Sequence, residues 1–514
     1  MVARLDNLPE EPEVLKALVR EQQLEIARLQ EYVNVLLAKR YGPSSEKVPE
    51  EQLRLFNEAE QQEAAPEPQP QAPVQVPAHE RAKPGRRALP EYLPRVEVVH
   101  ELPEEARVCD HDGEALVEIG RESSEQLDII PAQVRVIRHV RIKYACPCCH
   151  IGVKSAPMPA QPIAKSIASP GLLAHIAVAK YQDGLPLYRQ EAILRRSGVE
   201  LPRATLAGWM VKMGVLIQVL IDAMREHLLA YDIVQMDETR VQVLKEPGKA
   251  ATALSYMWVA RGGPPDKPVV LFDYDPTRSG DVPKRLLAGF AGYLQSDGYE
   301  GYNAVGREPD IIRVGCAAHC RRKFDEAVKA QSKSGKAGPA KAGKAWQGLA
   351  YFQKLYRIEA EIKGQSPEVR HRVRREQAKP LLDEIRTWLD ASLPQVPPQS
   401  ATGRALTYLD GQWEALIRYL DDGRLEIDNN LLENAIRPFA LGRKNWLFSD
   451  TVGGAKASAN LYSLIETAKA NGLDPYAYLR YVFTELPKAD TPEAIEALLP
   501  YNVDKACLTP PGPP

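Results

Sequence analysis

The chain has 514 residues, several times the ~100 to 200 residues of one domain, so we expect three or four folded units. Its hydrophobic content of 44% is ordinary for a soluble globular protein, and no stretch approaches the ~20 uninterrupted apolar residues of a membrane helix. The 66 Lys and Arg nearly balance the 68 Asp and Glu, which argues against a protein devoted to binding polyanions. The amino terminus is acidic and lacks a signal-peptide pattern, so a cytoplasmic protein with no membrane partner is expected.

The balanced total charge hides three local basic clusters, at residues 81–87, 135–143 and 370–379. Each is compatible with an ordinary solvated face or with a point of contact with DNA.

The first predicted element is a coiled-coil helix within residues 1–56. Between residues 13 and 40, mostly apolar residues recur at spacings of four and three, which is a heptad pattern. Such a helix either pairs with a second copy, giving a homo-oligomer, or packs on its own protein.

Residues 57–90 are rich in Gln, Glu, Ala and Pro, a composition that predicts a disordered linker. The basic end of this linker, at 83–87, either lies along DNA or contacts nothing.

Residues 91–160 predict a small zinc-binding module. A strand is expected over 133–144, with one face inward and arginines outward, and it leads directly to Cys146. Tetrahedral zinc needs four Cys or His ligands, usually as two close pairs. Cys109, Cys146 and Cys149 are the expected ligands, and the fourth is left open. The candidates for it are His111, Asp112, Cys148 and His150, and the alternative is a site that binds metal weakly.

Residues 161–230 are helical by pattern, and the segments 185–198 and 202–210 have the form of a helix-turn-helix. This region either reads DNA or serves as scaffold.

Residues 231–450 predict the main domain. Strands are expected at 233–243, 254–260, 268–273, 292–296 and 311–316, with a helix near 282–290. The order of three strands, helix, strand, helix and strand is that of the RNase H fold. A mostly helical, basic insertion occupies about 321–425, and a further helix begins near Asp428.

Residues 451–514 are expected to hold a helical stretch at 455–486, a short helical turn and a Pro-rich tail.

Three carboxylates stand out in that domain. Asp237 lies in the middle of the first strand, where a buried charge is costly unless compensated, and Asp297 follows the fourth strand before Gly298. Because these strands are neighbours in the proposed fold, the two aspartates would meet. Glu433 shares a helical face with Asn429, Asn430 and Arg437, beside an apolar stripe of Leu432 and Ile436. Two other interpretations remain open. Glu433 could form a surface ion pair with Arg437, and Asp297 could serve only to form a turn.

Phosphoryl transfer on DNA needs two metal ions ~3.5 to 4 Å apart, and carboxylate oxygens suit magnesium. We therefore expect Asp237, Asp297 and Glu433 to hold two Mg²⁺ ions and to act as catalytic residues.

At these residues the chain resembles the transposases of the insertion sequence 66 family, which have an Asp-Asp-Glu catalytic domain. The resemblance is carried by QMDET at 235–239, SDGYEGY at 296–302, GCAAHCRRKF at 315–324, DNNLLENAIRP at 428–438 and GRKNWLFS at 442–449. It extends to RYGPSSEK at 40–47, LPLYRQE at 185–191 and NGLDPYAYL at 471–479, and so spans nearly the whole chain.

The resemblance implies a multidomain α+β protein. Its RNase H-like α/β catalytic core carries a helical insertion, and it is joined to a coiled coil, a zinc module and a helical DNA-binding region. The family has a second CxxC pair in its zinc module, whereas this chain has Cys109-Asp-His-Asp112. The residues expected to contact DNA phosphates, or else to pair with acids, are His319, Arg321, Arg322, Arg437, Arg443 and Lys444.

The expected function is a DNA transposase that cleaves the ends of its element and joins the 3′ hydroxyls to target DNA, with possible accessory proteins of the same element. The alternatives are a non-catalytic DNA-binding regulator, which has no need of acids near a polyanion, and an RNase H-like nuclease without strand transfer.

Overall fold

The structure is a computed structural model and describes residues 22, 134–144, 154–332 and 343–508. The predicted coiled coil and linker lie almost wholly outside the described residues, as do Cys109, Cys146 and Cys149. The chain divides into two compact units, one formed by residues 65–156 and the other by the rest of the chain.

In the smaller unit, the described residues form one short antiparallel pair, β1 (Lys143–Tyr144) with β2 (Lys154–Ser155). The strand predicted over 133–144 is wrong for residues 134–142 and confirmed for residues 143 and 144. Val136 and Val140 are 93% and 77% exposed, so the inward face expected for this segment is not buried. A strand needs a hydrogen-bonded neighbour, and the ladder pairs only residues 143 and 144 with 155 and 154.

A six-stranded mixed sheet organises the larger unit. The first three strands form an antiparallel meander, β3 (Ile233–Lys245), β4 (Leu254–Gly262) and β5 (Val269–Asp275). Then β6 (Gly292–Gln295) and β7 (Ile311–Val314) extend the sheet parallel to β3, giving the order β5-β4-β3-β6-β7. All five predicted strands are confirmed. A sixth, β8 (Ser449–Thr451), pairs with the far end of β3 and is too short to leave a sequence pattern.

Short helices connect the parallel strands, α7 (Asp281–Leu286) before β6 and α8 (Gly301–Val305) before β7. The outer edge of the sheet is covered by α15 (Val452–Ala470). Two hydroxyl groups of α15 accept hydrogen bonds from β5. Ser463 Oγ accepts from the Phe272 N–H at 2.7 Å, and Thr467 Oγ1 accepts from the Val270 N–H at 3.0 Å. These hydroxyls satisfy backbone groups of an edge strand that would otherwise be unpaired.

The helices that precede the sheet are α3 (Pro170–Tyr181), α4 (Leu187–Arg196), α5 (Arg203–Leu216) and α6 (Gln218–Leu229). The predicted helical pair is confirmed as α4 and α5, joined through Gly198, whose φ of +78° favours glycine.

Within the described ranges, no single helix has the length and apolar composition to cross a membrane, although α5 and α6, bent by 46°, reach that threshold as a pair.

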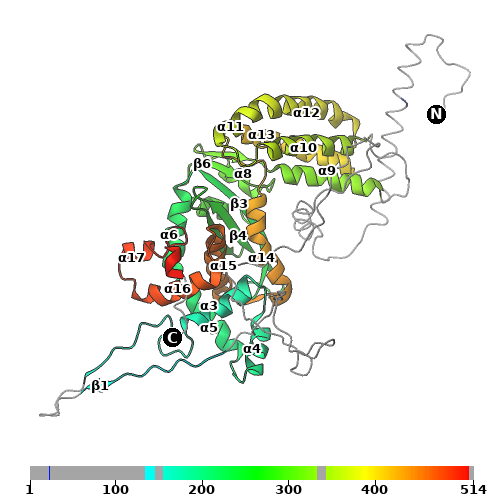
Figure 1. Cartoon of the computed structure of the whole chain (residues 1–514). Helices are drawn as coiled ribbons and strands as arrows, with labels where there is room; N and C mark the ends of the chain where they lie inside the picture. The colour runs from blue at the N-terminus through cyan, green and yellow to red at the C-terminus, as the bar shows by residue number, and fades with distance from the viewer. Residues whose placement is uncertain (1–21, 23–133, 145–153, 333–342, 509–514) are drawn as a thin grey trace, which may run out of the picture. The chain divides into compact units, whose positions relative to one another are not determined.

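The insertion is a helical bundle with its own hydrophobic core, shown in yellow-green and yellow beside α8 and β6 in Figure 1. Phe324, Phe352, Leu389 and Leu406 are among the most deeply buried residues of that core. Its elements are α9 (Ala317–Ser332), α10 (Lys344–Glu361), α11 (Pro367–Val373), the π-helical turn η4 (Arg374–Ala378), α12 (Lys379–Ser392), η5 (Leu393–Gln395), α13 (Ala401–Ile417) and η6 (Arg418–Leu420).

After the insertion, α14 (Asn430–Trp446) returns to lie against β3 and β4. The helical stretch predicted over 455–486 is two helices, α15 and α16 (Pro475–Glu485). Gly472 ends the first with a φ of +67°, and Asp474 caps the second by accepting from the Ala477 N–H. The chain continues through η7 (Leu486–Lys488), α17 (Pro492–Glu496) and η8 (Lys505–Leu508).

A close helix crossing yields the first prediction. A Cβ atom placed on Gly214 of α5 would lie 2.5 Å from the Cα atom of Ala457 in α15, so Gly214→Ala should force the two helices apart. Overpacking of this kind costs about 1 to 3 kcal/mol. We expect a lower urea midpoint for Gly214→Ala by circular dichroism. Gly208→Ala, on the same helix with open space around it, should leave the midpoint unchanged or raise it slightly. An equal loss in both variants would contradict the close-packing explanation.

Candidate active site

Asp237 and Asp297 are brought together by the register of two parallel strands. The ladder pairs Gln235 of β3 with Gln295 of β6, and each aspartate follows its glutamine by two residues. Both carboxylates therefore emerge at the same point along neighbouring strands, as the sequence predicted for strands one and four. Both side chains are partly buried.

Glu433 comes from the first turn of α14, which lies against β3 and β4. Leu432 and Ile436 are buried and form the apolar stripe that holds this helix on the core, as predicted. Glu433 is itself only 9% exposed, so the alternative of a surface side chain does not fit the structure.

The charges of the three carboxylates act on one another. The pKa of Asp237 is raised well above its ordinary value, chiefly by burial, and further by the negative charges of Glu238, Asp297 and Glu433. The backbone N–H of Glu238 donates to Asp237 Oδ1 at 2.8 Å and partly offsets this. Such a group of acids is electrostatically unfavourable by itself, and a bound cation would relieve the repulsion.

Glu238 is a fourth acid beside this group, and sequence reasoning missed it. Its carboxylate accepts from Arg278 Nε at 2.8 Å and from the Tyr302 hydroxyl at 2.8 Å. Burial and the charge of Asp297 nevertheless raise the pKa of Glu238 to about 7. The guanidinium of Arg278 also lies 3.8 Å from the ring centroid of Tyr299. The available sequence signal was the position of Glu238 next to Asp237 in the predicted strand.

The loop that carries Asp297 is held from two sides. Arg313 of β7 donates to the Asp297 carbonyl at 2.5 Å, and the Tyr408 hydroxyl of α13 accepts from the Gly298 N–H at 3.1 Å. A Cβ atom on Gly298 would lie 2.5 Å from that hydroxyl. The glycine predicted to permit a sharp turn is therefore required mainly because the Tyr408 ring lies against it, and its φ is not in the left-handed region.

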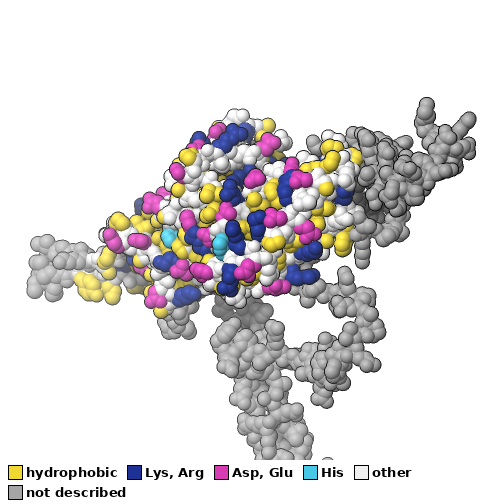
Figure 2. Space-filling model, turned by 90° about the horizontal axis from the view of Figure 1, so that it is seen from above, with side chains coloured by type: hydrophobic (Ala, Val, Ile, Leu, Met, Phe, Trp, Pro, Cys, Tyr) yellow, Lys and Arg dark blue, Asp and Glu magenta, His cyan; other side chains and the backbone are white. Residues whose placement is uncertain are grey.

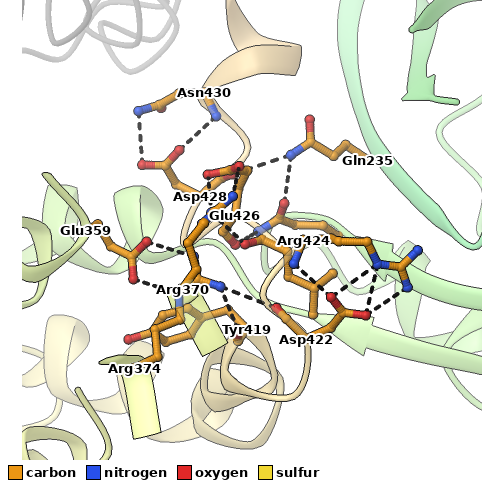
Figure 3. Close-up of polar contacts among 12 residues, drawn as sticks. Gln235, Glu359, Arg370, Arg374, Tyr419, Asp422, Arg424, Glu426, Asp428 and Asn430 are labelled. Carbon is orange, nitrogen blue, oxygen red and sulfur yellow. Dashed lines mark hydrogen bonds and ion pairs between the residues drawn. The ribbon is translucent and has the colours of Figure 1, made fainter. Parts of the chain in front are cut away.

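A strap of residues 418–429 links the insertion to the sheet beneath this site (Figure 3). Gln235 donates to Gln295 at 2.7 Å and to the Asp428 carbonyl at 3.4 Å, and Gln295 donates to the Glu426 carbonyl at 2.8 Å. Both glutamines are buried. Since buried amides need partners, these bonds fix the strap against β3 and β6 next to the aspartates.

Arginines of the insertion hold the other side of the strap. Arg374, fully buried, pairs with Glu359 at 2.7 Å and donates to the Tyr419 and Asp422 carbonyls, while Arg370 pairs with Glu426 at 3.0 Å. These residues belong to the basic cluster at 370–379, for which a solvated face or a DNA contact was predicted. For Arg374 both alternatives are wrong, because its charge is neutralised inside the bundle.

The strap ends at the start of α14. Asp428 accepts from the Asn430 N–H at 3.1 Å and so satisfies an amide in the first turn of the helix that carries Glu433. The hydroxyl of Tyr356, from α10 of the insertion, donates to Asp428 Oδ2 at 2.7 Å. The insertion therefore contacts the group that fixes the beginning of α14.

The cationic residues predicted near the site lie in two places. Arg321 and Arg322 are partly buried on α9, and the guanidinium of Arg321 is 6.0 Å from the Tyr356 ring centroid. His319 is on the same helix, with Nδ1 3.8 Å from Glu433 Oε1, and burial lowers its pKa well below the ordinary value.

The remaining predicted cations are on α14. Arg437 is partly buried one turn beyond Glu433, and Lys444 is exposed. Arg443 donates to Thr239 Oγ1 at 3.3 Å and to the Arg240 carbonyl, so it also anchors α14 on β3. On the face of the molecule in Figure 2, Lys and Arg side chains are interspersed with Asp and Glu.

These features define a mixed α+β protein whose central sheet, together with a helix laid across it, gathers a cluster of carboxylates. Residues 165–457 match the family described as "Transposase IS66 family", and the chain belongs to this family. Residues 463–501 match the "IS66 C-terminal element", residues 106–150 the "zinc-finger binding domain of transposase IS66", and residues 28–98 the "Transposase C of IS166 homeodomain". The family predicted from the sequence motifs is therefore confirmed.

Relatives that align with most of this chain are found in Sinorhizobium fredii (strain NBRC 101917 / NGR234). "Uncharacterized protein y4qI" is 34% identical, over 97% of this chain and 93% of its own length. "Uncharacterized protein y4jD" is also 34% identical, over 98% of both chains. "Uncharacterized protein y4hP" is 30% identical, over 83% of this chain and 78% of its own length.

The contact between the insertion and α14 can be tested with a single oxygen atom. Tyr356→Phe removes the hydroxyl that donates to Asp428, and a hydrogen bond to a charged group contributes about 1.5 to 3 kcal/mol. We expect amide exchange in the first turn of α14 to accelerate roughly 10-fold or more, measured by hydrogen–deuterium exchange and mass spectrometry. Tyr351→Phe removes a hydroxyl on the same helix that donates to Glu384 instead, and should leave that turn unchanged. Unchanged exchange in Tyr356→Phe would show that the contact does not stabilise α14.

Proposed function

We propose that this protein is an Asp-Asp-Glu transposase that cleaves the ends of its insertion sequence and joins the freed 3′ hydroxyls to target DNA. The observation that carries the proposal is the convergence of Asp237, Asp297 and Glu433, in which the other two acids help raise the pKa of Asp237. Membership of the transposase family supports the same assignment.

The sheet supports an RNase H-like core as part of this proposal. An antiparallel meander, extended on the β3 side by two parallel strands, has the strand order expected for that fold. In this arrangement the middle strand and its parallel neighbour each bring one aspartate to the site, and the returning helix brings the glutamate.

The donor set fits hard divalent cations, because carboxylate oxygens are the ligands that magnesium prefers. Two Mg²⁺ ions held by Asp237, Asp297 and Glu433 would supply activation of the attacking oxygen and stabilisation of the leaving oxygen. The chain's own contribution is to hold the three acids in place. Arg313 and Tyr408 fix the Asp297 loop, and the 418–429 strap and Arg443 fix α14.

DNA is the proposed partner, both as element ends and as target. Of the six predicted DNA contacts, Arg321, Arg322, Arg437 and Lys444 are the proposed phosphate contacts, since arginine and lysine bind phosphate oxygens by charge-assisted hydrogen bonds. His319 and Arg443 are not proposed as contacts, because the His319 side chain is only 13% exposed and Arg443 is bonded to β3. The exposed residues at the start of α5, among them Arg203 and Thr205, are the proposed DNA-reading surface of the α4–α5 pair. A dimer through the predicted N-terminal coiled coil and a cytoplasmic location complete the proposal.

A non-catalytic DNA-binding regulator is the second candidate, but it leaves the carboxylate cluster without a purpose, because acids repel the DNA backbone. An RNase H-like nuclease would use the same cluster. It is distinguished only by whether the 3′ hydroxyl is subsequently joined to a second DNA.

The central prediction concerns the three acids. Asp237→Asn, Asp297→Asn and Glu433→Gln should each lower Mg²⁺-dependent cleavage and joining of element ends by at least ~100-fold, because each removes a metal-binding charge while nearly preserving side-chain volume. Binding of the DNA ends, measured by gel shift, should persist.

The matched control for these variants is Glu246→Gln. Glu246 is a buried acid just beyond β3 that pairs with Ser255 and Lys249 outside the cluster, so activity should be retained. Full activity in any of the three cluster variants would remove that residue from the site, and cleavage without joining in the wild type would favour the nuclease.

Zinc in the N-terminal module is a separate prediction. Residues 106–150 match a zinc-finger binding domain, and Cys109, Cys146 and Cys149 are its proposed ligands. Cys146→Ala combined with Cys149→Ala should lower the zinc content of purified protein by about one ion per chain, measured by plasma mass spectrometry, since loss of two ligands leaves too few to hold the ion. Equal zinc content in the wild type and in the double variant would exclude Cys146 and Cys149 as ligands.

A further inference from the structure

A sulfur, a nitrogen and an oxygen donor meet beside the carboxylate cluster. Cys316 directly precedes α9, His319 is in the first turn of that helix, and Glu433 faces them from α14. The candidate ligand atoms of these three residues all lie within 4.8 Å of one another. This Cys316–His319–Glu433 cluster combines donors that two separate helices bring together.

The distance between His319 and Glu433 fits two ligands of one ion better than a hydrogen bond. Nδ1 of His319 is 3.8 Å from Glu433 Oε1, which is too long for a hydrogen bond. Nitrogen and oxygen ligands ~2.0 to 2.2 Å from a tetrahedral ion lie roughly 3.3 to 3.6 Å from each other, close to this separation. Nδ1 is also buried without a hydrogen-bond partner among the described residues.

Asn429 supplies a second observation. The thiol of Cys316 donates to Asn429 Oδ1 at 2.9 Å, whereas Asn429 Nδ2 is buried and makes no hydrogen bond in the described part of the chain. Because the two ends of an amide are assigned by their partners, a half-turn of this side chain would let Nδ2 donate to a thiolate at Cys316. The buried environment thus contains a donor that a metal-bound sulfur would use.

We propose that Cys316, His319 and Glu433 form a binding site for one borderline divalent transition-metal ion of the Zn²⁺ class. Thiolate and imidazole ligands select such ions over Mg²⁺. Binding releases the thiol proton to solvent, because a coordinated thiol is deprotonated. Three protein ligands leave the fourth tetrahedral position open.

The position of the cluster has a consequence for the neighbouring carboxylate site. The side chains of His319 and Glu433 remain 13% and 11% exposed. Glu433 is also a proposed magnesium ligand, so an ion bound at the cluster would compete for that carboxylate. Occupancy of the cluster would then oppose the Mg²⁺-dependent reaction.

The test is a Co²⁺ titration of the metal-stripped full-length chain, followed by absorbance and by the number of ions bound. Cobalt bound to a thiolate gives a near-ultraviolet charge-transfer band. The N-terminal cysteines are the same in every variant, so the difference between the wild type and Cys316→Ala reports the cluster alone. We expect Cys316→Ala to bind one ion fewer per chain and to lose part of that band, and His319→Asn to bind the same ion at least ~10-fold more weakly.

The matched control is Cys320→Ala, which removes a buried thiol one turn along α9, outside the cluster, and should keep the wild-type spectrum and stoichiometry. Identical titrations for the wild type, Cys316→Ala and His319→Asn would overturn the site, as would an equal loss in Cys320→Ala. Circular dichroism checks the fold of each variant, and His319→Asn remains decisive if Cys316→Ala does not fold. The spectrum does not depend on DNA cleavage, so this inference and the proposed function fail separately.

Discussion

The central constraint on this structure is the repulsion among carboxylates that are held close together and partly out of water. Asp237 and Glu238 come from β3, Asp297 from the loop after β6, and Glu433 from α14. Burial and the neighbouring negative charges oppose ionisation of Asp237 and Glu238. Arg278 compensates Glu238 on one side. The remaining charge is the reason that the site suits divalent cations, and much of the surrounding structure serves to keep the acids in place despite the repulsion.

The helical insertion takes part in this support. It has a separate hydrophobic core, but Tyr408 contacts the Asp297 loop and Tyr356 contacts Asp428 at the start of α14. Between these points, the 418–429 strap is bonded to insertion arginines on one side and to two buried glutamines of the sheet on the other (Figure 3). The geometry of the carboxylates therefore depends on residues that precede and follow the insertion as well as on residues within it.

Local patterns in the sequence predicted most elements of the larger unit. Strands with strong apolar patterns and helices with clear periodicity were found where expected, since these signals depend on neighbouring residues alone. The failures have specific causes. The strand over 133–144 lacks a hydrogen-bonded neighbour for most of its length, and the stretch 455–486 is interrupted by Gly472 and the Asp474 cap. Arg374 is basic in sequence but buried against Glu359, a pairing that spans 15 residues.

The sequence by itself determined the family, through motifs that surround Asp237, Asp297 and Glu433. It also determined five strands of the central sheet and that the first and fourth are neighbours. Only the tertiary structure decided what surrounds those acids. Glu238 facing Arg278, Tyr356 against Asp428, and His319 beside Glu433 join residues 40, 72 and 114 positions apart in the chain. Contacts of this kind arise from the packing of whole elements, and no local spacing in the sequence encodes them.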